Sequence, residues 1–131
     1  MTLDERKIIM QQHRVVREIE RVGSNYTFKR NNKNEFGEET EEKQEVCSVK
    51  ALYHATKGYA TRMIGESSIV ITKGMPMLLC VKDEISDKIK NGDIVEVNGC
   101  KHVVSDKNNV NEYNILYDIS LEVVLNGNSQ N

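Results

Sequence analysis

The hydrophobic positions near the start of the chain predict one amphipathic helix over residues 3–22. Apolar residues recur there at helical spacing and form a single narrow stripe: Ile8, Ile9, Val15, Val16, Ile19 and Val22. Thr2 and Glu5 have the spacing of a capping box, and Gly23 stands where a left-handed C-cap is expected. A stripe this narrow packs on one surface, which is either the rest of the chain or a neighbouring subunit.

After the helix, the pattern changes to the alternation that is typical of β-strands. Five segments either alternate or are continuously apolar: 26–30, 45–54, 69–71, 77–81 and 114–125. The last of them has one apolar face, formed by Ile115, Tyr117, Ile119, Leu121, Val123 and Leu125. Pro76 predicts a bend or a sheet edge before the fourth segment. Residues 83–90 predict one or two helical turns.

The strongest local signal is the dipeptide Asn98-Gly99, which separates two β-branched runs. This dipeptide favours a type I′ turn, because both of its residues tolerate a positive φ angle. We therefore expect a two-residue hairpin in which Val97 faces Cys100.

Together these elements predict a mainly β fold: a small β-barrel with an N-terminal α-helix and a long inter-strand loop. We expect three parts, which are an amphipathic helix over 1–23, a barrel over 24–125 and a flexible polar tail over 126–131. A length of 131 residues agrees with one domain and one modest hydrophobic core.

The long inter-strand loop is predicted over residues 55–68, where the strand pattern breaks. Loops longer than about 12 residues are uncommon in compact domains and are often functional. This segment combines glycines, basic residues and large side chains: Lys57, Gly58, Tyr59, Arg62, Met63, Ile64 and Gly65. It is therefore the first candidate for a functional segment, and the alternative is an ordinary surface loop.

A run of acidic residues precedes the second predicted strand. It comprises Glu38, Glu39, Glu41, Glu42 and Glu45, with only Lys43 to offset them. Such a run is usually a solvated face. The functional alternative is an acidic wall that faces a charged partner.

The overall charge and the thiols narrow the class of protein. A formal net charge of −2 gives no global attraction to nucleic acid or to an anionic membrane. Three cysteines cannot all pair within the chain, which favours reduced thiols in a reducing compartment. The charged N-terminus lacks the apolar region of a secretory signal, and no run approaches the roughly 18 apolar residues of a membrane span.

The sequence offers no convincing catalytic or metal site. Zinc sites usually show close pairs of cysteine or histidine, and no such pair occurs here. His102 and Asp106 leave the predicted hairpin on different faces, and no serine or cysteine has the context of a nucleophile. The glycines lack the spacing of a phosphate loop. We therefore expect a binding protein without cofactor or metal, and not an enzyme.

Three stretches carry a resemblance to a known family. They are the glycine-containing segment before Ile69, the run Asn-Gly-Asp-Ile-Val-Glu-Val-Asn-Gly at 91–99, and the strand at 114–123. With the short strand at 26–30, they resemble tailed-phage head-closure proteins, the stopper subunits of the phage neck, including prophage-derived relatives. The resemblance covers roughly residues 25–125, and the N-terminal helix is longer than in the shorter family members.

This resemblance implies a structural role in the virion neck, after synthesis and assembly in the cytoplasm of the bacterial host. Family members form a small β-barrel that assembles into a ring below the portal and adaptor proteins. The ring retains packaged double-stranded DNA without sequence specificity and docks the tail terminator or tail tube, with no membrane contact. The loop that matches the family's gating loop is 55–68. From their positions in the sequence, Ile8, Val15, Ile19, Glu38, Glu39, Glu41 and Glu42 are candidates for subunit or partner contacts.

A different class remains as the alternative, an OB-like module that binds single-stranded nucleic acid. Such a module stacks bases on aromatic residues of a basic strand face. The scattered tyrosines and the negative net charge of this chain argue against it.

Overall fold

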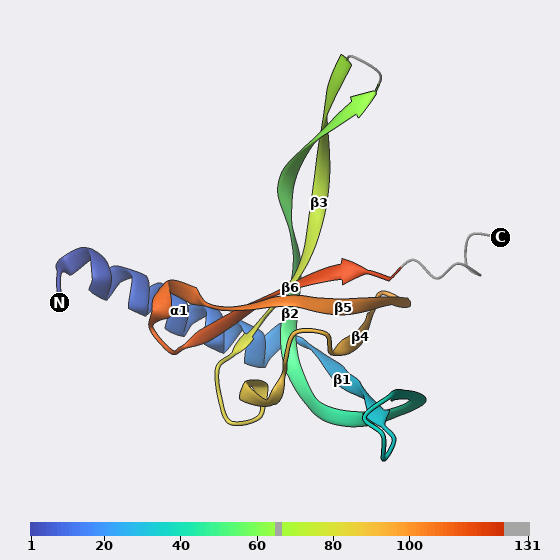
Figure 1. The fold of residues 1–131 in the computed structure, drawn as a ribbon. Helices are drawn as coiled ribbons and strands as arrows, with labels where there is room; N and C mark the ends of the chain where they lie inside the picture. The colour runs from blue at the N-terminus through green and yellow to red at the C-terminus, as the bar shows by residue number, and fades with distance from the viewer. Residues whose placement is uncertain (65–66, 125–131) are drawn as a thin grey trace.

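The computed structural model describes residues 1–64 and 67–124, with the side chains of 41, 56–64 and 67–74 excepted. Helix α1 (Leu3–Val22) is followed by six strands, which form one closed antiparallel barrel in the order β1-β2-β3-β6-β5-β4 (Figure 1). The strands are β1 (Ser24–Lys33), β2 (Glu39–Ile64), β3 (Ser67–Val81), β4 (Ile94–Val97), β5 (Cys100–Asn109) and β6 (Leu116–Val123). Two short 3-10 turns, η1 (Ser86–Lys88) and η2 (Val110–Glu112), connect them. The predicted fold class, a mainly β barrel with one N-terminal helix, is confirmed.

The inward faces of all six strands form one hydrophobic core. Its members are Phe28, Cys47, Val49, Ala51, Leu78, Cys80, Val95, Val97, Val104, Tyr117, Ile119 and Leu121, joined by Ile89 from the segment after η1. The predicted inward face of β6 is confirmed for Tyr117, Ile119 and Leu121. It is wrong for Val123, which lies at the end of β6 and is 51% exposed. Leu125 lies outside the described residues.

The hairpin of β4 and β5 is confirmed in its predicted register. Val97 pairs with Cys100 across the two-residue turn. Asn98 and Gly99 have φ angles of 53° and 78°, the positive values that a type I′ turn requires.

Helix α1 has the predicted bounds and the predicted N-cap. The Thr2 hydroxyl oxygen accepts a hydrogen bond from the backbone N–H of Glu5 at 3.1 Å. The predicted left-handed C-cap is wrong, because Gly23 has φ −65° and ψ 155°. A glycine fits this position for a different reason: a Cβ atom would lie 2.5 Å from the carbonyl oxygen of Ile19. The Lys50 ammonium group donates to the Glu20 carbonyl at 2.7 Å and so satisfies one end of the helix.

The predicted loop over 55–68 is not a loop. Strand β2 continues to Ile64, β3 begins at Ser67, and the two pair from Ala55↔Pro76 to Ile64↔Ser67. The β-branched run at 69–72, which pairs with residues 59–62, favours extended backbone despite the glycines of this segment. Figure 1 shows the result as a two-stranded ribbon that extends away from the barrel. We call residues 55–64 and 67–76 the β2–β3 ribbon.

Pro76 marks the place where the ribbon leaves the barrel. Strand β6 pairs with β3 only from Met77↔Ser120 to Val81↔Leu116. Of the two sequence-based alternatives for Pro76, a bend or a sheet edge, the structure has the edge, and β3 continues through this position as one strand.

Candidate functional site

The first candidate site is the β2–β3 ribbon, which holds most of the predicted gating residues. Six of these residues belong to β2 by their backbone: Lys57, Gly58, Tyr59, Arg62, Met63 and Ile64. Their side chains, and all of Gly65, lie outside the described residues. Beyond the barrel, β2 and β3 pair only with each other within the described strands. Each strand of the ribbon therefore presents an outer edge of backbone N–H and C=O groups.

The acidic run lies at the other end of β2, around the β1–β2 turn. Glu38 precedes the strand, and Glu39, Glu41 and Glu42 begin it. Glu38, Glu39 and Glu42 are exposed, while the side chain of Glu41 lies outside the described residues. Phe36, 78% exposed, stands in the turn itself, where the Asn34 carboxamide oxygen accepts hydrogen bonds from the N–H groups of Phe36 and Glu38. The β1–β2 turn thus combines negative charge with one exposed aromatic ring.

The apolar stripe of α1 packs on the chain's own barrel. Ile19 is 1% exposed, and α1 contacts β2 and β3. Ile8 and Val15 are half-buried and line a groove of about 650 Å³ between α1 and the outer barrel face. Leu116 lines the same groove and is 2% exposed, although the alternation of β6 placed it on the solvent face. The helix covers that face, which explains why Leu116 is buried.

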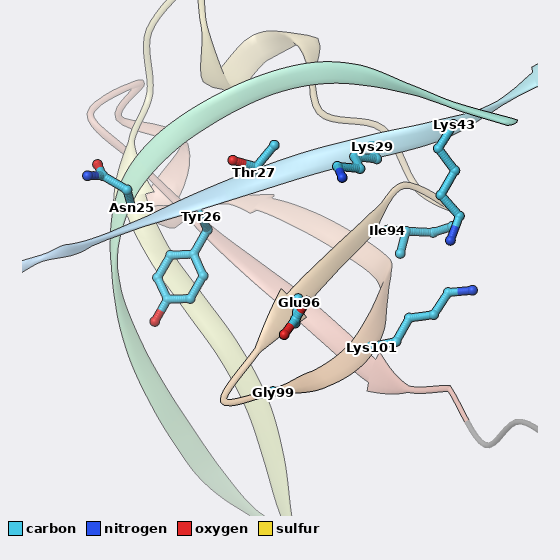
Figure 2. Close-up of a pocket in the computed structure, with 9 residues that line it drawn as sticks. All are labelled: Asn25, Tyr26, Thr27, Lys29, Lys43, Ile94, Glu96, Gly99 and Lys101. Carbon is cyan, nitrogen blue, oxygen red and sulfur yellow. The ribbon is translucent and has the colours of Figure 1, made fainter. Parts of the chain in front are cut away.

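Sequence reasoning missed a second candidate site, a pocket of about 480 Å³ at the seam where β1 meets β4 (Figure 2). Only two register pairs close the barrel there, Phe28↔Val95 and Lys29↔Ile94. Beyond these pairs β1 and the β4–β5 hairpin diverge and leave an open pocket. We call it the seam pocket. Its lining residues are Asn25, Tyr26, Thr27, Lys29, Lys43, Ile94, Glu96, Gly99 and Lys101.

Positive charge gathers at one end of the seam pocket. The side chains of Lys43 on β2 and Lys101 on β5 reach toward each other in Figure 2. The nearby Lys101 ammonium group lowers the pKa of Lys43. In the part of the chain that the structure describes, no carboxylate forms an ion pair with Lys29, Lys43 or Lys101.

A buried ion pair holds the seam together beside this pocket. The Arg30 guanidinium group donates from Nε and Nη2 to the two carboxylate oxygens of Asp93, at 2.7 and 2.9 Å. Asp93 is 1% exposed and also accepts from the backbone N–H of Lys90 at 2.8 Å. The Asp93 carboxylate raises the pKa of Arg30. The pair joins β1 to the start of β4 where few strand hydrogen bonds do so.

Two of the three thiols, Cys47 and Cys80, are buried and offer little reactive chemistry, whereas Cys100 is exposed. Burial raises the pKa of Cys80 to about 12 and also raises the pKa of Cys47, so both thiols stay protonated near neutral pH. His54 Nε2 lies 2.8 Å from Asp118 Oδ1 on the outer barrel face. Among the side chains that the structure describes, no three histidine, cysteine or acidic residues are grouped to hold a metal ion.

Comparisons with known proteins give no family for this chain. Neither the models of known protein families nor the curated protein sequences contain a match. Within the described residues, no helix is long and apolar enough to cross a membrane.

Proposed function

We propose that this protein is a structural subunit of a phage neck, which forms a ring between the portal or adaptor and the tail, helps to retain packaged DNA and docks the tail. The observation that carries the proposal is the β2–β3 ribbon. The core residues that the structure describes all come from outside the ribbon, and the described ribbon side chains, those of Ala55, Met75 and Pro76, are not among them.

The dimensions of the ribbon suit a gate. Ten register pairs lie beyond the barrel, from Ala55↔Pro76 to Ile64↔Ser67. At about 3.3 Å per residue, they reach about 30 Å. An isolated two-stranded ribbon is marginally stable in water. In a ring, identical ribbons stand at a high effective concentration, so contacts between them become favourable without any new contact chemistry.

The residue types of the ribbon suit contact with DNA. The sequence from 55 to 76 includes three basic residues, Lys57, Arg62 and Lys73, and one acidic residue, Glu66. A ring multiplies these charges by the number of subunits, and the resulting collar attracts phosphate groups without reading the base sequence.

The β1–β2 turn provides a surface for a protein partner. Its exposed Phe36 offers an apolar contact, and the surrounding Glu38, Glu39 and Glu42 repel DNA. These properties suit docking to an adaptor or a tail protein better than they suit the channel wall.

The test is made in the phage or prophage whose genome encodes the chain. Residues 58–73 are replaced by Asn-Gly, which closes a two-residue turn between Lys57 and Gly74, a register pair of the ribbon. The barrel register from Ala51↔Cys80 to Tyr53↔Leu78 is untouched, so we expect the purified variant to unfold at the urea concentration of wild type, within error. The fraction of full heads, counted by electron microscopy, should fall although tails still attach.

Two outcomes count against the proposal. Heads that stay as full as wild type with the trimmed ribbon would reject the gating role and leave only tail docking. Deletion of the whole gene serves as the second arm: tailed, full heads in its absence would reject the neck role altogether.

The alternative, an OB-like module for single-stranded nucleic acid, has weaker support. Of the tyrosines whose side chains the structure describes, only Tyr26 lines the lysine-containing pocket. Such modules combine a basic groove with several stacking aromatic residues.

A further inference from the structure

We propose that the seam pocket is a binding site for a nucleotide phosphate group, which Lys43 and Lys101 hold between their ammonium groups. This site is separate from the β2–β3 ribbon and does not depend on the proposed neck function.

The arrangement of the lysines carries this proposal. Lys43 and Lys101 come from β2 and β5, and their side chains converge on one space (Figure 2). Lys29, from β1, lines the same pocket. Two ammonium groups that face each other repel, and the Lys101 ammonium group accordingly lowers the pKa of Lys43. An anion between them removes the repulsion and forms charge-assisted hydrogen bonds with both groups.

The shape of the pocket identifies what else the ligand contains. Its volume of about 480 Å³ is much larger than one phosphate group. Figure 2 places the two lysines at one end and Tyr26 at the other, with Glu96 between them. A carboxylate at that position accepts hydrogen bonds from hydroxyl groups. The half-buried Tyr26 ring packs against the barrel core, and the part of it that lines the pocket offers a surface to a planar base. Phosphate, hydroxyl groups and a base in this order describe a nucleotide.

The charged residues around the pocket favour a free nucleotide over a nucleic-acid strand as the source of this phosphate. A free nucleotide places one anionic group at the lysine end, whereas a nucleic-acid strand also brings phosphates past Glu96 and the acidic β1–β2 turn. Those carboxylates repel additional phosphates. We therefore expect the free nucleoside monophosphate to bind better, per phosphate group, than a single strand.

The experiment is a titration of the ¹⁵N-labelled full chain, followed by NMR at low salt. The probes are inorganic phosphate, a nucleoside monophosphate, the same nucleoside without phosphate, and a short single-stranded DNA. The first two should shift the amides of Lys43, Ile94 and Lys101 in a saturable way, and the nucleoside alone should shift them far less. The fold of each variant is checked by its own spectrum.

Matched variants make the result specific. Lys101→Gln should weaken nucleotide binding about tenfold, the effect of one lost charge-assisted hydrogen bond. Lys7→Gln removes the same charge from α1, outside the seam pocket, and should leave the dissociation constant within about twofold of wild type. Equal weakening by both variants, or the absence of saturable shifts with any phosphate, would overturn the proposal. Binding of the single strand alone, if it depends on Lys101, would support the phosphate site and assign the phosphate to nucleic acid.

Discussion

Closure of the barrel at the β1–β4 seam should depend on the ion pair of Arg30 and Asp93. Only two register pairs join β1 to β4, so the bidentate contact at 2.7 and 2.9 Å is a large part of what connects them. Arg30→Met keeps an unbranched side chain but leaves a carboxylate that is 1% exposed with one remaining donor, the N–H of Lys90. The variant tests how much of the barrel's stability the pair provides.

The expected cost follows from the burial of the two partners. Removal of one partner of a buried pair typically destabilises a protein by about 3–5 kcal/mol. Because the Arg30 side chain is itself 41% exposed, water reaches part of the site. We therefore expect the lower end, about 3 kcal/mol, which is a considerable share of a small domain's total stability of about 5–15 kcal/mol.

Urea unfolding at neutral pH measures this cost, with Arg21→Met as the matched control. Arg21 pairs with Glu18 at 2.6 Å on the surface of α1, where the two side chains are 70% and 47% exposed. Such a pair contributes only about 0.3–0.5 kcal/mol. In the double variant Arg30→Met with Asp93→Asn, the costs should be less than additive by about 2 kcal/mol, because no unpaired charge remains. If Arg30→Met unfolds at the same urea concentration as Arg21→Met, the pair does not close the barrel.

Three further predictions concern the core, the C-terminal end of α1 and the loss of stability at acidic pH. Ile119→Ala empties a site that is 0% exposed and should lower the free energy of unfolding by about 2–5 kcal/mol. Val123→Ala should change it by less than about 0.5 kcal/mol. Similar free energies of unfolding for the two variants, measured with urea, would refute the register of β6. Gly23→Ala should cost about 1–3 kcal/mol, since its Cβ would lie 2.5 Å from a helix carbonyl, and an unchanged urea midpoint would contradict this. The Tyr117 hydroxyl and a neighbouring ammonium group lower the pKa of Asp87, so its stabilising effect is present above the unfolded pKa of about 3.9 and disappears as pH falls below it. Asp87→Asn should therefore flatten the loss of stability below about pH 4, and equal slopes for variant and wild type would be evidence against that assignment.

The elements that the sequence predicts correctly are those that local chemistry determines. Thr2 caps the N-terminus of α1 as expected, and Asn98-Gly99 sets the β4–β5 register by backbone preference alone. Neither feature needs information from the rest of the chain. The inward face of β6 also follows from its own alternation, up to its exposed end at Val123.

The errors arise where a distant segment decides the outcome. The alternation of β6 assigns Leu116 to the solvent face, but Leu116 lines the groove beside α1 and is 2% exposed. The segment 55–68 looks like a loop because its glycines interrupt the alternation, and alternation is a signal of one buried face. Within the described strands, β2 and β3 pair only with each other beyond the barrel, so their sequence does not have to follow the alternation of a barrel strand.

The seam pocket was beyond sequence reasoning for the same reason, and this gives a last prediction. Lys43 is positioned by the β1–β2 register and Lys101 by the β4–β5 register. The two hairpins pair with each other directly at the seam, and β3 and β6 join them around the other side of the barrel. If Asp93→Asn opens the seam, Lys101 should move away and the pKa of Lys43 should rise toward its ordinary value of 10.5. The loss of the Asp93 negative charge cannot raise the pKa of Lys43, so a rise would indicate that the two lysines have separated. NMR titration of the Lys43 side chain shows whether its pKa in Asp93→Asn is higher or lower than in wild type. A lower pKa would show that the seam stays closed without the ion pair.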